Sequence, residues 1–272
     1  MFDSGLGGLT VLRQIRRARP DLNLLCIADQ AHVPYGGRPL AEVRDFALGI
    51  ARALVDAGCE AIVMACNISS ATAATAASRE LQPARVIGMI DAAMREVRAN
   101  TGGVLYRPIG LLATAGTVAS RAYDDAVRGA FAGGTVRAVA CPALVPLIED
   151  GLRDTAEIGR CAERYLEPLA AIEAEPIILG CTHYPLVIDY LQQAAHHTYG
   201  RPVAFVDPAL GVVDELGAVF QPQPGVSSGS LILASTLDTG RFQEQASRWL
   251  SEPCDTAVAR WEAGTLHIGN TG

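Results

Sequence analysis

The chain has 272 residues, a net charge of −7 and 50% hydrophobic residues, enough apolar sequence for one large or two medium globular domains. The negative charge argues against nucleic acid as a main partner, because phosphate contacts need clustered cations, and it fits an anionic membrane surface poorly. No uninterrupted apolar stretch reaches the roughly 18 residues of a membrane-spanning helix, and the first residues lack the charged start and apolar block of a signal peptide.

The cysteine and lysine content indicates where the protein resides and which reaction types it cannot catalyse. Seven cysteines, an odd number with no C-x-x-C pair, match neither a secreted disulfide framework nor a structural zinc site. We therefore expect a cytoplasmic protein with free thiols. The chain has no lysine, since all 22 basic residues are arginine. This excludes a pyridoxal-phosphate Schiff base, Schiff-base aldol chemistry and a Walker P-loop.

The predicted elements alternate between strands and helices. In the first third of the chain we expect helices over 9–18, 40–57 and 69–81, and strands over 24–28, 61–65 and 86–90. Further strands are expected over 109–113, 136–140, 177–179 and 203–206, followed by a strand over 231–235 and a helix over 242–250. This alternation predicts parallel α/β sheets. A strand ending at Asp3 would have only two residues before it, so either the start lacks residues or the strand is a stub. The tail after Ala263 is expected to be mobile.

Two apolar runs each end in a cysteine that is followed by a small polar residue. These cysteines are Cys66 and Cys181, and each is typical of a buried parallel strand that delivers a thiol to its carboxyl end, where open sheets bind ligands. Asp3 lies 63 residues before the first cysteine, and Thr114 lies 67 residues before the second. Similar spacings predict an internal duplication, although chance matches in an Ala/Gly-rich chain are the alternative.

A duplication of this kind predicts two pseudo-symmetric parallel-sheet domains with the active site in the cleft between them. We assign residues 1–92 and 209–272 to a discontinuous N-terminal α/β domain and residues 93–208 to the second domain.

Two thiols on opposite walls of a cleft can invert a carbon centre without a cofactor, because Cys66 can take a proton from one face while Cys181 returns one to the other. A thiol pKa of about 8.5 makes both protonation states accessible near neutral pH, and helix N-termini lower it. Asp3 could accept a proton from one thiol and His183 from the other. Alternatively, Asp3 could cap the helix that starts near Leu9, and His183 could simply pack beside its neighbours.

The residues at these positions resemble the aspartate/glutamate racemase superfamily. The resemblance rests on Asp3-Ser4-Gly5, Pro34-Tyr35-Gly36, Ala65-Cys66-Asn67, Cys141-Pro142 with Glu149, and Gly180-Cys181-Thr182-His183-Tyr184-Pro185. It extends from residue 2 to about residue 260, and the combination of motifs is more specific than any one of them.

The resemblance implies a racemase that interconverts L- and D-glutamate without a cofactor or metal and so supplies D-glutamate for peptidoglycan. It implies that Cys66 and Cys181 are the catalytic acid/base residues, with Asp3 assisting the first and His183 and Glu149 assisting the second. It also implies substrate contacts from six residues, namely Ser4, Tyr35, Gly36, Asn67, Thr117 and Thr182. The expected partner is a small amino-acid substrate, and a homodimer is plausible by analogy only.

The chain departs from the family at Ile68, where the family usually has threonine after Cys-Asn. Loss of a hydroxyl donor to a buried carboxylate could cost roughly 1–3 kcal/mol, or about 5- to 150-fold in affinity. Three alternatives stay open: a racemase for another acidic amino acid such as aspartate, a weakened family member with a binding role, and a thiol hydrolase that uses Cys181 and His183 but leaves Cys66 without a role.

Overall fold

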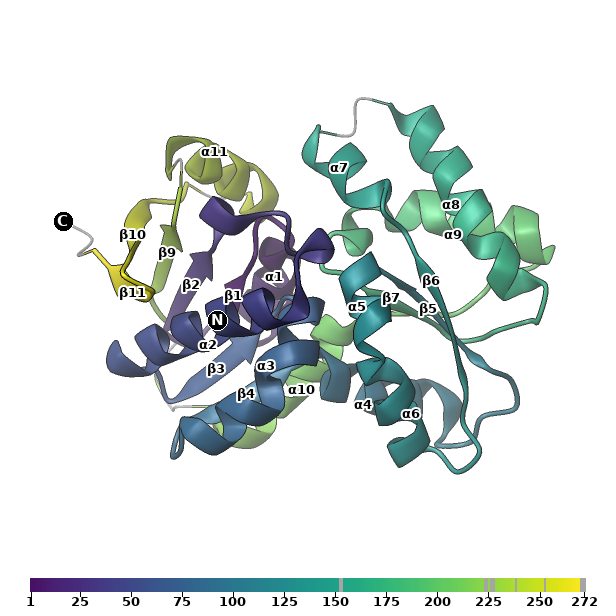
Figure 1. Ribbon diagram of the computed structural model, residues 1–272, viewed down its shortest axis with the longest axis horizontal. Helices are drawn as coiled ribbons and strands as arrows, with labels where there is room; N and C mark the ends of the chain where they lie inside the picture. Colours follow the sequence, from purple (N-terminus) through teal and green to yellow (C-terminus); the bar gives the residue numbers. More distant parts are fainter. Residues whose placement is uncertain (152–153, 223–224, 226–227, 238, 252, 270–272) are drawn as a thin grey trace.

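Two α/β lobes lie side by side in the computed structural model, which describes residues 1–151, 154–222, 225, 228–237, 239–251 and 253–269 (Figure 1). Within these residues, no helix has both the length and the apolar character needed to cross a bilayer.

Among the described residues, the first lobe contains a seven-stranded sheet in the order β11-β10-β9-β2-β1-β3-β4. Its strands are β1 (Phe2–Asp3), β2 (Leu24–Ala28), β3 (Ala61–Met64), β4 (Arg85–Gly88), β9 (Leu231–Ser235), β10 (Thr256–Glu262) and β11 (Thr265–Ile268). The strands pair in parallel except in the β10–β11 hairpin. Strand β9 pairs with β2 along its whole length, which confirms that the chain returns to the first sheet.

The second lobe contains a parallel sheet in the order β6-β5-β7-β8. Its strands are β5 (Ile109–Ala113), β6 (Val136–Ala140), β7 (Ile177–Gly180) and β8 (Phe205–Val206). This order repeats the β2-β1-β3-β4 order of the first sheet strand for strand. The predicted fold class, two pseudo-symmetric parallel sheets, is therefore confirmed.

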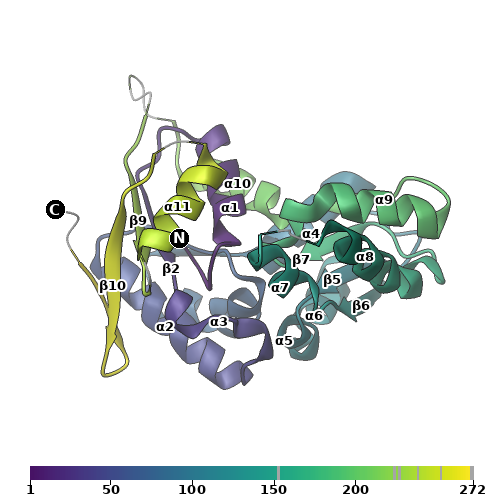
Figure 2. The ribbon, with the colours of Figure 1, turned by 90° about the horizontal axis from the view of Figure 1, so that it is seen from above.

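Helices cover both faces of each sheet (Figure 2). On the first sheet they are α1 (Gly8–Ala18), α10 (Pro208–Val219) and α11 (Thr239–Leu250) on one face, and α2 (Leu40–Asp56) and α3 (Asn67–Glu80) on the other. On the second sheet they are α4 (Met89–Thr101) and α6 (Ala122–Ala130) on one face, and α7 (Leu144–Glu149), α8 (Thr155–Ala170) and α9 (Ile188–Tyr199) on the other. Because strands covered on both faces meet no water, β5 and β7 are apolar and buried throughout.

Several predicted boundaries are wrong in a way that matters for the site. The helix expected over 69–81 begins at Asn67, so Cys66 is the residue that precedes its first turn. The strand expected over 86–90 ends at Gly88, because α4 starts at once with Met89. The strand expected over 203–206 is limited to Phe205–Val206.

The expectation of a mobile tail after Ala263 is wrong for the described residues that follow it. Ala263 and Gly264 have φ values of 48° and 82°, which suit a tight hairpin turn. The turn returns the chain as β11, whose Leu266 is buried against the first sheet. Residues 270–272 lie outside the described residues.

Candidate active site

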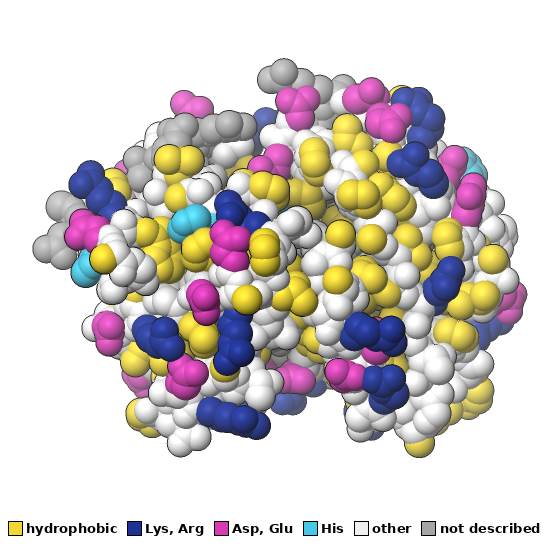
Figure 3. All heavy atoms as spheres, in the orientation of Figure 1, with side chains coloured by type: hydrophobic (Ala, Val, Ile, Leu, Met, Phe, Trp, Pro, Cys, Tyr) yellow, Lys and Arg dark blue, Asp and Glu magenta, His cyan; other side chains and the backbone are white. Residues whose placement is uncertain are grey.

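A cavity of about 360 Å³ lies between the two lobes, at the carboxyl ends of both sheets. Its walls come from the segments after β1, β2 and β3 on one side and after β5, β6 and β7 on the other. In the space-filling view, hydrophobic side chains gather across the middle of the face where the lobes meet (Figure 3). Open parallel sheets bind ligands at this edge, so the cavity is the candidate site.

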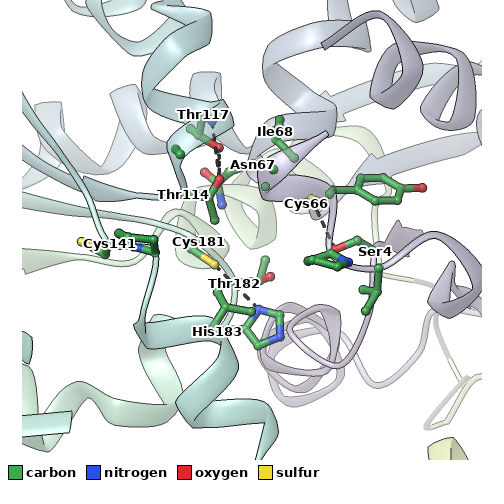
Figure 4. A pocket seen from close by; sticks show the side chains of 18 of the residues that line it. Ser4, Cys66, Asn67, Ile68, Thr114, Thr117, Cys141, Cys181, Thr182 and His183 are labelled. Atoms are coloured by element: carbon green, nitrogen blue, oxygen red, sulfur yellow. Dashed lines mark hydrogen bonds between the residues drawn. The ribbon is translucent and has the colours of Figure 1, made fainter. Parts of the chain in front are cut away.

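The first cysteine lies on the wall that belongs to the seven-stranded sheet. Cys66 follows β3 and immediately precedes α3, and its Sγ lies 3.8 Å from the Ser4 Oγ (Figure 4). Burial of the sulfur and the nearby charge of Asp3 raise the pKa of Cys66 to about 12, although the Ser69 amide and hydroxyl and the Ser4 hydroxyl oppose this rise. The first thiol therefore needs hydrogen-bond donors before it can act as a base.

The second cysteine faces the same cavity from the other lobe. Cys181 follows β7, and its Sγ lies 3.7 Å from the His183 Nδ1 (Figure 4). The other ring nitrogen, Nε2, lies 2.9 Å from the Glu149 Oε1. Burial disfavours the charged ring, but its hydrogen bonds to Cys181 and Glu149 raise the pKa of His183 to about 10. A protonated imidazole can therefore stand beside this thiol near neutral pH.

Asp3 is the one predicted catalytic residue that does not line the described cavity. Its carboxylate accepts hydrogen bonds from the Gly5 amide at 2.9 Å and from the Thr182 hydroxyl at 3.1 Å. The second bond joins the two lobes directly. Burial raises the pKa of Asp3, partly offset by the charge of His183. Gly7 precedes α1 and has no side-chain cap, but the Gly8 amide at the first residue of α1 also lowers the pKa of Asp3, so the alternative in which Asp3 satisfies free amides of this helix stays open.

All six predicted substrate contacts line the cavity, namely Ser4, Tyr35, Gly36, Asn67, Thr117 and Thr182. Tyr35 contributes its ring rather than its hydroxyl, because the hydroxyl donates to the Asp29 carboxylate at 2.5 Å. Asn67 is better placed for a ligand. Its Oδ1 accepts a hydrogen bond from the Tyr123 hydroxyl at 2.6 Å, which leaves the buried Nδ2 without a partner in the described structure.

Tyr123 is a site residue that the sequence did not indicate. It lies on α6, 56 residues from Asn67, and its ring is fully buried. The hydrogen bond from Tyr123 to Oδ1 fixes the orientation of the Asn67 side chain and leaves its amide nitrogen free to donate to a ligand. No sequence motif marks this contact, because it arises only when α6 packs beside the start of α3.

Among the described residues that line the cavity, none is lysine or arginine, and Glu149 is the only carboxylate. An anionic substrate would therefore meet backbone amides, hydroxyls and the Asn67 amide rather than a cationic side chain. Ile68, the residue at which the chain departs from the family, lies in this wall and is 2% exposed. It packs so closely on Gly116 that a Cβ at position 116 would overlap the Ile68 side chain.

Paired parallel sheets that share one cavity, with a thiol on each wall, define the racemase class of isomerases. Comparison with known families agrees, and the chain belongs to the Asp/Glu/Hydantoin racemase family, whose model matches residues 9–216.

Relatives extend the match over nearly the whole chain. A glutamate racemase of Synechococcus sp. (strain CC9605) is 38% identical over 265 residues, covering 94% of this chain and 95% of that protein. A glutamate racemase of Roseiflexus sp. (strain RS-1) is 36% identical and covers 94% and 92%. The crystal structure of a glutamate racemase isoform from Bacillus anthracis is similar with a TM-score of 0.83 at 30% identity, covering 97% of both chains. That of the Thermus thermophilus glutamate racemase in complex with beta-chloro-D-alanine has a TM-score of 0.77 at 35% identity, covering 96% and 95%.

Proposed function

We propose that this protein interconverts L- and D-glutamate by proton transfer at Cα, with Cys66 and Cys181 as the two acid/base groups and no cofactor. The observation that carries the proposal is that both sulfurs face one cavity from opposite lobes. Relatives that span more than nine-tenths of the chain and are named glutamate racemase support the choice of substrate.

The proposed reaction uses one thiolate and one thiol at a time. The thiolate takes the Cα proton and becomes a thiol, while the opposite thiol delivers its proton to the other face of the same carbon and becomes a thiolate. The substrate charge and the total number of protons are unchanged, and the reverse reaction uses the same groups in exchanged roles. This differs from acyl transfer, in which one thiol would form a covalent intermediate and the other would have no duty.

The supporting groups have separate roles in the proposal. His183, held by Glu149, stabilises the Cys181 thiolate through its protonated ring. The charge of Asp3 raises the pKa of Cys66 and so favours the thiol form of that cysteine. Asp3 also holds the two lobes together by accepting a hydrogen bond from the Thr182 hydroxyl.

Substrate carboxylates would bind to the uncharged donors of the cavity wall. The proposed contacts are Ser4, Tyr35, Gly36, Asn67, Thr117 and Thr182. The unpartnered Asn67 Nδ2 supports this assignment most directly, because a buried amide donor without an acceptor is unfavourable until a ligand supplies one.

The compartment, the metabolic role and the oligomeric state are proposed by analogy with the family. We propose that the protein acts in the cytoplasm, supplies D-glutamate for peptidoglycan and can form a homodimer. We also propose that residues 1–92 with 209–272 and residues 93–208 form the two domains that enclose the substrate.

Deuterium exchange tests the mechanism and the substrate together. Purified protein is incubated separately with L-glutamate, D-glutamate and the two aspartate enantiomers in deuterium oxide without added cofactor. Chirality is followed by circular dichroism, and Cα deuterium by NMR. We expect glutamate to racemise from either enantiomer, with one deuterium at Cα of the inverted product, because the donating thiol carries a solvent-derived deuteron.

Single replacements of the two thiols complete the test. Cys66→Ser and Cys181→Ser should each abolish racemisation, whereas Cys59→Ser, which alters a half-buried thiol outside the cavity, should retain it. Racemisation at the wild-type rate by either cavity variant would disprove the two-thiol mechanism. Turnover of aspartate but not glutamate would disprove the proposed substrate while leaving the mechanism intact.

A further inference from the structure

The two thiols of the cavity have unequal surroundings. Cys181 has the His183 ring beside it, and that ring can carry a positive charge. Cys66 has no such ring. Burial and the Asp3 charge oppose its ionisation, and the groups that favour it are the uncharged donors Ser69 and Ser4. A reaction that needs each thiol as a thiolate in turn therefore needs a stabilising donor on the Cys66 side.

Ser69 occupies a position from which its hydroxyl can act on Cys66. Cys66 immediately precedes α3, and Ser69 is the third residue of that helix. The side chain of a residue before a helix commonly lies close to the amide of the third helical residue. Cys66 makes no cap hydrogen bond in this structure, but the Ser69 amide and hydroxyl both lower its pKa, which agrees with their place beside the sulfur.

The Ser69 hydroxyl has no other task in the described structure. Its side chain is fully buried, and its Oγ has no hydrogen-bond partner there. Ser69 also does not line the cavity, so it is not placed to contact the substrate. A buried hydroxyl without a partner is unfavourable, so the Ser69 hydroxyl is available to an acceptor that arises during the reaction.

The neighbouring serine shows the contrast. The Ser70 hydroxyl donates to the Met64 carbonyl at 2.7 Å and accepts the Met89 amide at 3.0 Å, so it joins the end of β3 to the start of α4. Ser70 is therefore committed to the fold, whereas Ser69 is not.

We propose that Ser69 is a positioning residue whose hydroxyl donates a hydrogen bond to the Cys66 thiolate, doing for the first thiol what His183 does for the second. The inference rests on the proposed role of Cys66 as an acid/base group. A thiol is a weak hydrogen-bond acceptor and a thiolate a strong one, so the bond forms when Cys66 ionises and the proton leaves for the substrate or solvent.

Other titratable groups around Cys66 do not supply this donor. Asp3 at the end of β1 is an acceptor that raises the pKa of the thiol, and the Tyr35 hydroxyl is committed to Asp29. Across the cavity, His183 is already engaged with Cys181 and Glu149.

Alkylation with iodoacetamide tests the inference without relying on turnover. The rates at Cys66 and Cys181 are measured in the same sample by mass spectrometry of their peptides, between pH 7 and pH 9.5. Ser69→Ala should slow alkylation of Cys66 about tenfold at fixed pH, because one lost hydrogen bond to a charged group raises a pKa by about one unit. The rate at Cys181 should not change, and kcat should fall by a similar factor with little change in KM.

Ser70→Ala is the matched control. It removes two structural hydrogen bonds, so it should lower the midpoint of denaturant unfolding while leaving the Cys66-to-Cys181 alkylation ratio as in the wild type. A wild-type ratio in Ser69→Ala, or equal slowing at both cysteines, would overturn the inference. A wild-type protein that racemises neither glutamate nor aspartate would instead contradict the proposed function, because the alkylation ratio is independent of turnover.

Discussion

Replacing Glu149 by glutamine is expected to weaken the positive charge beside Cys181. His183 is 4% exposed, and burial alone would favour a neutral ring. Its hydrogen bonds, including the 2.9 Å contact with Glu149, nevertheless raise its pKa to about 10. Glutamine keeps an oxygen acceptor at that position but removes the negative charge, so the change tests the charge rather than the shape of the site.

The size of the effect follows from that one contact. A hydrogen bond to a charged group contributes about 1.5–3 kcal/mol, and one pKa unit corresponds to about 1.36 kcal/mol. The pKa of His183 should therefore fall by about one to two units, to between about 8 and 9. At pH 9 the protonated fraction of the ring would drop about two- to tenfold, and kcat should fall by a similar factor, with a smaller loss at pH 7.

Two measurements check the prediction. The His183 ring resonances are titrated by NMR in the wild type and in Glu149→Gln, and kcat is measured from pH 6 to pH 10. The free energy of unfolding should also depend on the protonation of His183. A folded-state pKa raised above about 6.5 contributes stability that is fully present below pH 6.5 and is lost as the pH rises through about 10. In Glu149→Gln this loss should occur at lower pH.

Glu163→Gln is the control, because Glu163 pairs with His197 in an exposed ion pair outside the cavity. It should leave the pH dependence of kcat unchanged. The reasoning is refuted if His183 in Glu149→Gln still titrates near pH 10, or if the alkaline decline of kcat keeps its wild-type position.

Three further substitutions test the walls of the cavity. Ile68→Thr should lower KM for glutamate by about fivefold or more, because it restores a hydroxyl donor beside the Asn67 amide, with KM and kcat measured by a racemisation assay. Tyr123→Phe should raise KM about three- to tenfold, with a smaller effect on kcat, because Asn67 loses the hydroxyl that orients its amide. Gly7→Ala should lower both kcat and the free energy of unfolding, the latter by about 1–3 kcal/mol in urea denaturation, because its Cβ would overlap the Thr182 hydroxyl.

For each of these three predictions, one outcome would contradict the reasoning. Activity on glutamate that is equal or better in the wild type than in Ile68→Thr would remove Ile68 as a determinant of affinity. An unchanged KM in Tyr123→Phe would mean that Asn67 needs no orientation. For Gly7→Ala, the control is Gly129→Ala in α6, where an added Cβ has no atom within 4 Å and should not alter kcat. Equal kcat values in both glycine variants would refute the packing argument.

Much of the fold could be predicted because its signals are local. The strands over 24–28, 109–113, 136–140 and 231–235 have the predicted bounds. Burial on both faces explains the apolar run over 109–113, whereas the strand over 136–140 lies at the edge of its sheet and is recognised by its short run of strand-forming residues. The β10–β11 hairpin was missed because its turn, Ala263-Gly264, depends on backbone angles that composition does not reveal.

The two halves of the fold differ in the detail of their turns. Asp207 caps α10 by accepting the Ala209 amide, whereas Asp91 lies inside the first turn of α4. The strand order nevertheless repeats between the sheets. Strand order is retained because it is fixed by the packing of whole elements, whereas a single turn residue can shift by a position or two.

The sequence by itself determined that two thiols end two buried parallel strands, since that pattern needs only neighbouring residues. Tertiary structure decided which groups act on them. Glu149 reaches His183 across 34 residues, and Asp3 reaches Thr182 across 179. A pKa depends on the water that is excluded and on the charges that remain near a group. Both are set by distant segments that pack against the site, so only the assembled lobes give Cys66 and Cys181 their different surroundings.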